Sequence, residues 1–127
     1  MRILIEITLG EIINLTPALK TLMEKSFKGN IAFKISRLAR ELNKETILFE
    51  EEQNKILQRY AEKDEEGNIV YSSDKYIKVS SPNDYNEEIN KLLKTKVEIN
   101  AGKIPSEFLE AIEISPADLM LLDCIIE

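Results

Sequence analysis

The chain has 127 residues and a formal net charge of −6, with 43% apolar and 31% charged side chains. This composition is typical of a globular protein rather than a disordered one, and the length predicts a single domain over residues 1–127. The charge is uneven, because residues 64–127 contain six basic and fourteen acidic side chains, and such an acidic half disfavours nucleic acids and anionic membrane surfaces.

The first 29 residues predict a strand followed by helix. Residues 2–8 (RILIEITL) partly alternate and are rich in β-branched side chains, which favours a strand. Residues 9–15 indicate a short helical turn. Thr16-Pro17 then has the pattern of an N-cap followed by proline at the first helical position, so a second helix is expected from there to Lys28-Gly29.

A long helix is predicted next, because neither glycine nor proline occurs between Asn30 and Glu66. Ile35, Leu42, Phe49 and Ile56 recur every seven residues, which is typical of a helix with a narrow, coiled-coil-like apolar seam. The pattern predicts one helix over residues 30–63. A helical hairpin that breaks near Asn43-Lys44 is the alternative.

Residues 60–71 (YAEKDEEGNIVY) look at first like a metal-binding loop. A helical calcium loop needs glycine at its sixth position and glutamate at its twelfth. Counted from Asp64, Gly67 is fourth and Lys75 is twelfth, so the calcium interpretation fails twice. Gly67 is better explained as a residue with positive φ, which ends the long helix and turns the chain into a strand.

The remaining elements are short. Residues 68–71 and 76–79 predict a β-hairpin, Pro82 opens a helix, residues 96–100 predict a strand, and residues 105–112 predict a short helix. Ser115-Pro116 begins a last helix that is apolar on nearly every side, and therefore buried in the core or covered by another chain. The predicted fold class is α+β: one long helix plus several short helices packed on a small, mainly antiparallel sheet of residues 2–8, 68–71, 76–79 and 96–100.

The residue types present argue against catalysis. The sequence contains no histidine, which removes the commonest general base, the Ser-His and Cys-His pairs and most zinc sites. Cys124, the only cysteine, lies in an apolar segment where a thiol stays protonated and packs in a core. No glycine-rich phosphate loop is present. We therefore predict a protein that is not an enzyme and has no cofactor or metal.

One basic patch is a candidate partner-binding site. Lys34, Arg37, Arg40 and Lys44 lie in the predicted long helix, and the last three share a helix face, as would suit phosphates or an acidic protein surface. Glu41 interrupts the patch, and no aromatic side chain is expected beside it. Plain solubility, a protein contact and nucleic-acid binding all remain open, with nucleic acid the least favoured.

Geometry adds a candidate oligomer interface. A helix over residues 30–63 is about 50 Å long, whereas a compact domain of this size is roughly 35 Å across. The helix would then overhang its own domain and expose Leu42, Phe49 and Ile56 unless another chain covered them. An antiparallel homodimer of long helices is the expected solution.

Three segments carry a resemblance to a known family: residues 5–12 (IEITLGEI), residues 60–68 (YAEKDEEGN) and residues 114–120 (ISPADLM). In these segments, and over nearly the whole chain, the sequence resembles a family of small uncharacterised proteins from phages and prophages of low-GC Gram-positive bacteria. The resemblance implies a phage or prophage accessory protein. The single cysteine and a start without the features of a signal peptide make the cytoplasm of the bacterial host the expected location. The resemblance implies no activity and no functional residues.

These observations favour a protein-binding or assembly module of phage origin that acts as an oligomer. One alternative is an inhibitor that sequesters a host defence protein or signalling molecule, with the acidic half suited to a basic target. A second alternative is a nucleic-acid-binding regulator that uses the basic patch.

Overall fold

A computed structural model describes residues 4–127 and confirms the α+β fold class. Residues 2 and 3 of the first predicted strand lie outside the described residues. The elements follow in the order β1 (Ile5–Thr8), α1 (Leu9–Met23), α2 (Gly29–Tyr60), α3 (Pro82–Leu93), β2 (Lys96–Ile99), a 3₁₀ helix η1 (Ser106–Ala111), α4 (Pro116–Leu122) and a second 3₁₀ helix η2 (Asp123–Ile125).

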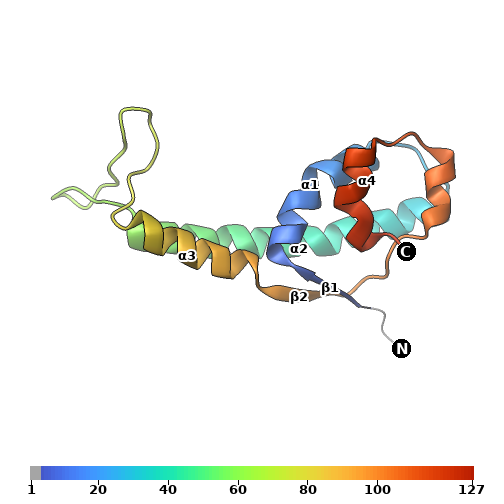
Figure 1. The fold of residues 1–127 in the computed structure, drawn as a ribbon, viewed down its shortest axis with the longest axis horizontal. Coiled ribbons are helices and arrows are strands. Elements are labelled where there is room, and N and C mark those ends of the chain that lie inside the picture. Colours follow the sequence, from blue (N-terminus) through green and yellow to red (C-terminus); the bar gives the residue numbers. More distant parts are fainter. Residues whose placement is uncertain (1–3) are drawn as a thin grey trace.

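Helix α2 runs without a break through Asn43, so the single-helix prediction was right and the hairpin alternative was wrong. Its 32 residues span about 48 Å, and the other elements are arranged along it (Figure 1). The predicted seam is its buried face, on which Ile35, Leu38 and Leu42 are at most 3% exposed.

Helix α1 differs from the sequence prediction, which divided it in two. It begins at Leu9, because Thr8 forms a capping box with Glu11: the Glu11 N–H donates to Thr8 Oγ1, and the Thr8 N–H donates to Glu11 Oε1. Pro17 therefore lies inside the helix rather than at its start. An interior proline costs about 3 kcal/mol. This cost is offset by an uninterrupted buried stripe that consists of Leu9, Ile12, Leu15, Ala18, Leu19 and Leu22.

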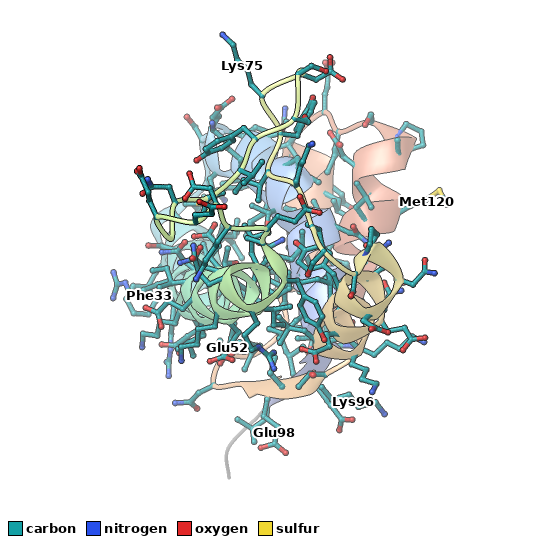
Figure 2. The ribbon with its side chains drawn as sticks, turned by 90° about the vertical axis from the view of Figure 1, so that its left-hand side faces the viewer. Phe33, Glu52, Lys75, Lys96, Glu98 and Met120 are labelled. Carbon is teal, nitrogen blue, oxygen red and sulfur yellow. The ribbon has the colours of Figure 1, made fainter. Side chains whose placement is uncertain are left out.

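The core lies around the amino-terminal half of α2. β1 and β2 form a two-stranded antiparallel sheet in which Ile5 pairs with Ile99 and Ile7 with Val97. Helices α1 and α4 pack against each other. Leu122, just inside the end of α4, and Ile125 in η2 are completely buried, whereas Met120 is 80% exposed and points outward in Figure 2. The last helix is thus buried on one side only.

The predicted four-stranded sheet was wrong, since residues 68–71 and 76–79 do not join β1 and β2. They belong to residues 61–81, here called the arm, which projects beyond the far end of α2 (Figure 1). A closed ring of three backbone hydrogen bonds holds the arm: Glu62 N to Lys78 O, Lys78 N to Val70 O, and Val70 N to Glu62 O, at 2.8–3.0 Å. The length of α2 separates these segments from the sheet.

The two tips of the arm are turns that depend on left-handed residues. At the first tip Gly67 has φ of 84°, as predicted, and the Asp64 carboxylate accepts from the N–H groups of Glu66 and Asn68. At the second tip Lys75 has φ of 68°. The helix itself ends earlier than predicted, at Tyr60. The acidic run is therefore a hydrogen-bonded turn.

Helix α3 returns along the carboxyl-terminal half of α2 (Figure 1). At the outer end of this pair, Glu88 Oε1 accepts a 3.1 Å hydrogen bond from the Tyr60 hydroxyl, and its other oxygen forms an ion pair with Arg59. Tyr60 also packs edge to face on Tyr85, with 6.2 Å between ring centroids. These contacts fasten the start of α3 to the end of α2.

Gly10 provides a test of how closely α1 and α3 approach. A Cβ at this position would lie 3.0 Å from the Leu93 carbonyl oxygen, whereas a Cβ at Gly29 would have nothing within 4 Å. Although alanine favours helix over glycine, we expect Gly10→Ala to lower the free energy of unfolding by about 1 kcal/mol or more, because a backbone carbonyl must move. Gly29→Ala should leave it unchanged or slightly higher. Urea unfolding of both variants measures this, and equal stability of the two would contradict the close approach.

A second prediction concerns the Tyr60–Glu88 hydrogen bond. The Glu88 carboxylate accepts a hydrogen bond from the neutral phenol and repels the phenolate, so it raises the pKa of Tyr60 above the ordinary 10.0. The stabilisation from this bond is present below about pH 10 and is lost as pH rises through the folded-state pKa. Glu88→Ala should return the Tyr60 pKa toward 10.0, as measured by an NMR titration of its ring. Glu87→Ala, which changes an exposed neighbouring glutamate, should leave the Tyr60 pKa as it is.

Candidate functional site

The predicted oligomer-interface residues lie inside the single chain. Leu42 is 2% exposed, and Phe49 and Ile56 are each 6% exposed. The expectation that they would be exposed unless another chain covered them was wrong. The reason is that α1 packs on the amino-terminal half of α2, which contains Leu42, and that α3 lies along the overhanging half and covers it from within the same chain. Overhang of the long helix therefore gives no argument for a second chain at this seam.

The predicted partner-binding residues lie on a different side of α2. Lys34, Arg37, Arg40 and Lys44 are all exposed. Lys44 forms a 2.9 Å ion pair with Glu41, whereas Lys34, Arg37 and Arg40 form no ion pair with any residue between 4 and 127. The patch is therefore a solvent-exposed basic surface, and three of its four cations are available to a partner.

The structure adds an aromatic side chain that the sequence analysis missed. Phe33 is 67% exposed and projects from the side of α2 opposite α3 (Figure 2). It precedes Arg37 by four residues and Arg40 by seven, so the three side chains share one face of the helix. The same spacing could have been found in the sequence. The expectation that no aromatic accompanies the patch was wrong.

This side of α2, which neither α1 nor α3 covers, is here called the open face. Each helical residue turns about 100°, and the exposed side chains that fall within roughly 100° of one another on this side define it. They are Asn30, Phe33, Arg37, Arg40, Lys44, Ile47, Leu48, Glu51, Lys55 and Gln58. Ile47 and Leu48 are 47% and 53% exposed, which gives the face apolar side chains near its middle.

A groove lies at the amino-terminal end of the open face. It has a volume of about 510 Å³ and runs between the first turns of α2 and residues 101–105. Phe33, Lys34, Arg37 and Lys103 contribute the apolar ring and three cationic groups, and Glu127 contributes one acid. We call this the basic groove. It combines an apolar surface with a net positive charge in a chain that is acidic as a whole.

Groups that could perform chemistry are sparse in the described structure. Burial raises the pKa of the Cys124 thiol, and the nearby Glu11 carboxylate adds to this effect, so the thiol is protonated at neutral pH. Among residues 4–127, no three acidic or cysteine side chains converge as metal ligands would. Over the same residues, no helix is both long and apolar enough to cross a membrane.

Comparison with known proteins adds no functional information. No protein-family model, no curated protein and no solved structure matches the chain. The geometry of α2 and of the basic groove is therefore the basis for a functional proposal.

The burial of Phe49 generates a stability prediction with a control next to it in the sequence. Phe49→Ala removes a ring that is 6% exposed, so we expect a loss of about 3–5 kcal/mol in the free energy of unfolding. Leu48→Ala, at a side chain that is 53% exposed, should change it by about 0.5 kcal/mol or less. Denaturant unfolding of both variants measures the difference. Similar values for the two would mean that α3 does not cover this half of α2.

Proposed function

We propose that this protein is a non-catalytic protein-binding module of phage or prophage origin, and that it acts in assembly by holding an acidic partner protein in the basic groove. The observation that carries the proposal is the exposed Phe33 ring among the unpaired Lys34 and Arg37. Aromatic side chains and arginine are enriched where proteins bind one another. The phage origin rests on the sequence resemblance alone.

Charge complementarity supports an acidic partner. The chain has a net charge of −6, so a generally basic partner would be attracted to its whole surface, whereas an acidic partner is attracted only to the basic groove and the adjoining open face. The acidic surface of the chain repels such a partner everywhere else, so the attraction at the basic groove orients the two proteins as they meet. A segment with acidic residues beside one apolar side chain would satisfy both the cations and Phe33.

The absence of histidine and the protonated thiol of Cys124 support the non-catalytic part of the proposal. An inhibitor that sequesters a host defence protein or signalling molecule is a version of the same binding function, and the groove would serve it equally. The two differ in the identity of the partner.

The experiment is affinity capture from cells in which the source phage is replicating, with quantitative mass spectrometry of the retained proteins. Arg37→Glu/Lys103→Glu reverses the charge of the groove, and Lys78→Glu/Lys91→Glu makes the same charge change at exposed positions elsewhere. We expect a protein partner that the wild type and the second variant retain and that the first variant loses at least about tenfold. If every retained protein survives the groove reversal, the proposal is wrong.

A second candidate function is nucleic-acid binding, which the exposed Phe33 ring beside the cations favours. An aromatic ring with flanking arginine and lysine is the usual arrangement for stacking a base and holding a phosphate. Fluorescence anisotropy with a single-stranded oligonucleotide at low salt separates the two candidates. Binding that weakens steeply with added salt and is lost in Arg37→Glu would support this second function, and no binding would exclude it.

A further inference from the structure

We propose that the open face of α2 binds an acidic amphipathic helix of the partner protein. This helix starts in the basic groove and runs along α2 as far as Ile47 and Leu48, on the side opposite the buried stripe. The inference rests on the proposed function, because the basic groove forms one end of the surface. It adds that the acidic segment of the partner is a helix and that its binding site extends beyond the groove.

Exposed apolar side chains lie at both ends of the proposed site. Phe33 is 67% exposed and projects from α2 (Figure 2), and Ile47 and Leu48 are 47% and 53% exposed. Phe33 and Ile47 are fourteen residues apart, which is two repeats of seven, so both lie on the line along which a second helix contacts α2. The distance between them along the helix axis is about 21 Å. Two apolar side chains of a partner helix at the same interval would cover them.

On the open face, the charged side chains between these two ends are all basic. They are Arg37, Arg40 and Lys44. Arg37 and Arg40 form no ion pair with any residue between 4 and 127, and Lys44 keeps 63% of its side chain exposed within its ion pair. Beyond this segment the face changes sign between Glu51 and Lys55, so it adds no preference there. A row of cations between two apolar ends favours a partner segment in which acidic side chains lie between apolar ones.

A helix matches this surface better than an extended segment does. Its side chains rise by the same interval per residue as those of α2, so the two rows stay in step over the whole distance. Its backbone N–H and C=O groups are bonded internally, whereas an extended segment needs a sheet edge to pair them, and a helix face offers none. A nucleic acid would engage the cations but would leave the aliphatic side chains at the far end uncovered.

A second copy of α2 does not satisfy the same surface. An antiparallel pair that sets Phe33 against Ile47 brings the two Arg40 side chains together, and a shift toward the carboxyl end sets Lys55 against Arg37. A parallel pair opposes each arginine to itself. Like charges in contact disfavour all three arrangements, so the cations select an acidic helix from a different protein.

The probe for this inference is a synthetic peptide of about 28 residues, which is long enough to form a helix in water. It has leucine at the two positions that match Phe33 and Ile47, glutamate at the three between them that match the cations, and alanine and glutamine elsewhere. Because the charge pattern reads the same from either end, one peptide tests both orientations. Fluorescence anisotropy with the full chain at about 50 mM salt should give a dissociation constant of about 100 μM or below, as expected for a short, exposed interface.

Variants outside the basic groove locate the peptide on the open face. Arg40→Glu should weaken binding at least about tenfold, and Ile47→Gln/Leu48→Gln at least about threefold. Lys91→Glu makes the same change of net charge on α3 and should leave binding within about twofold of the wild type. A peptide of the same composition in scrambled order should bind at least about tenfold more weakly. All the changed side chains are exposed, so circular dichroism should show an intact fold.

No binding up to about 1 mM, equal binding of the scrambled peptide, or unchanged binding in Arg40→Glu would each overturn the inference. A single-stranded oligonucleotide that binds more tightly than the peptide and is released by Arg40→Glu would also overturn it, as would self-association of the wild type that this variant abolishes.

The capture experiment separates this inference from the proposed function. A partner that is lost on charge reversal of the groove but retained by Ile47→Gln/Leu48→Gln would overturn the helix along the open face and leave the proposed function standing. A set of retained proteins that all survive the groove reversal would contradict the proposed function, whatever the peptide does.

Discussion

The fold depends on covering one continuous apolar stripe along α2. This helix is 32 residues long, and its buried side chains extend from Ile35 to Ile56, so a single compact core at one end cannot cover them all. The amino-terminal half is covered by α1 and the sheet, and the carboxyl-terminal half is covered by α3. Because α3 must run back along α2, the chain needs the arm to reverse its direction, and β2 then arrives beside β1. There, the Leu9 N–H donates to the Thr95 carbonyl at 3.0 Å. This hydrogen bond links the start of α1 to the segment between α3 and β2.

Local patterns predicted the elements well because each depends on near neighbours in the sequence. The seven-residue repeat from Ile35 to Ile56 identified α2, and the Ser115 side chain caps α4 as its sequence indicates, with a 3.1 Å bond from the Asp118 N–H. The prediction divided α1 in two because the sequence contains two candidate N-caps, Thr8 and Thr16. Thr16-Pro17 has the better cap pattern, but Thr8 forms a complete capping box, and burial of the stripe on either side of Pro17 outweighs the missing hydrogen bond.

What the sequence could not predict was which distant segments meet. Residues 68–71 and 76–79 have the same alternation as the paired strands, yet they form isolated bridges within the arm, since the length of α2 keeps them from the sheet. The interface at Leu42, Phe49 and Ile56 was inferred for a compact globule, whereas the protein is elongated and covers its own helix with α3 (Figure 1). Phe33 was missed for another reason: its spacing from Arg37 was visible, but only the structure shows that nothing covers it.

The open face is hard to explain as a stabilising feature of α2. Arg37, Arg40 and Lys44 follow one another at spacings of three and four residues. Each such pair of like charges costs a helix a few tenths of a kcal/mol, and the ion pair between Lys44 and Glu41 returns a similar amount. The first turn of α2 also contains no acidic residue that would favour the positive end of the helix dipole. The buried stripe and the cations thus lie on opposite faces of the same helix, so the cations contribute nothing to the core and little to the stability of the helix. An exposed surface that contributes so little to the fold, with an exposed aromatic ring at one end and half-exposed aliphatic side chains at its centre, has the composition of a binding face.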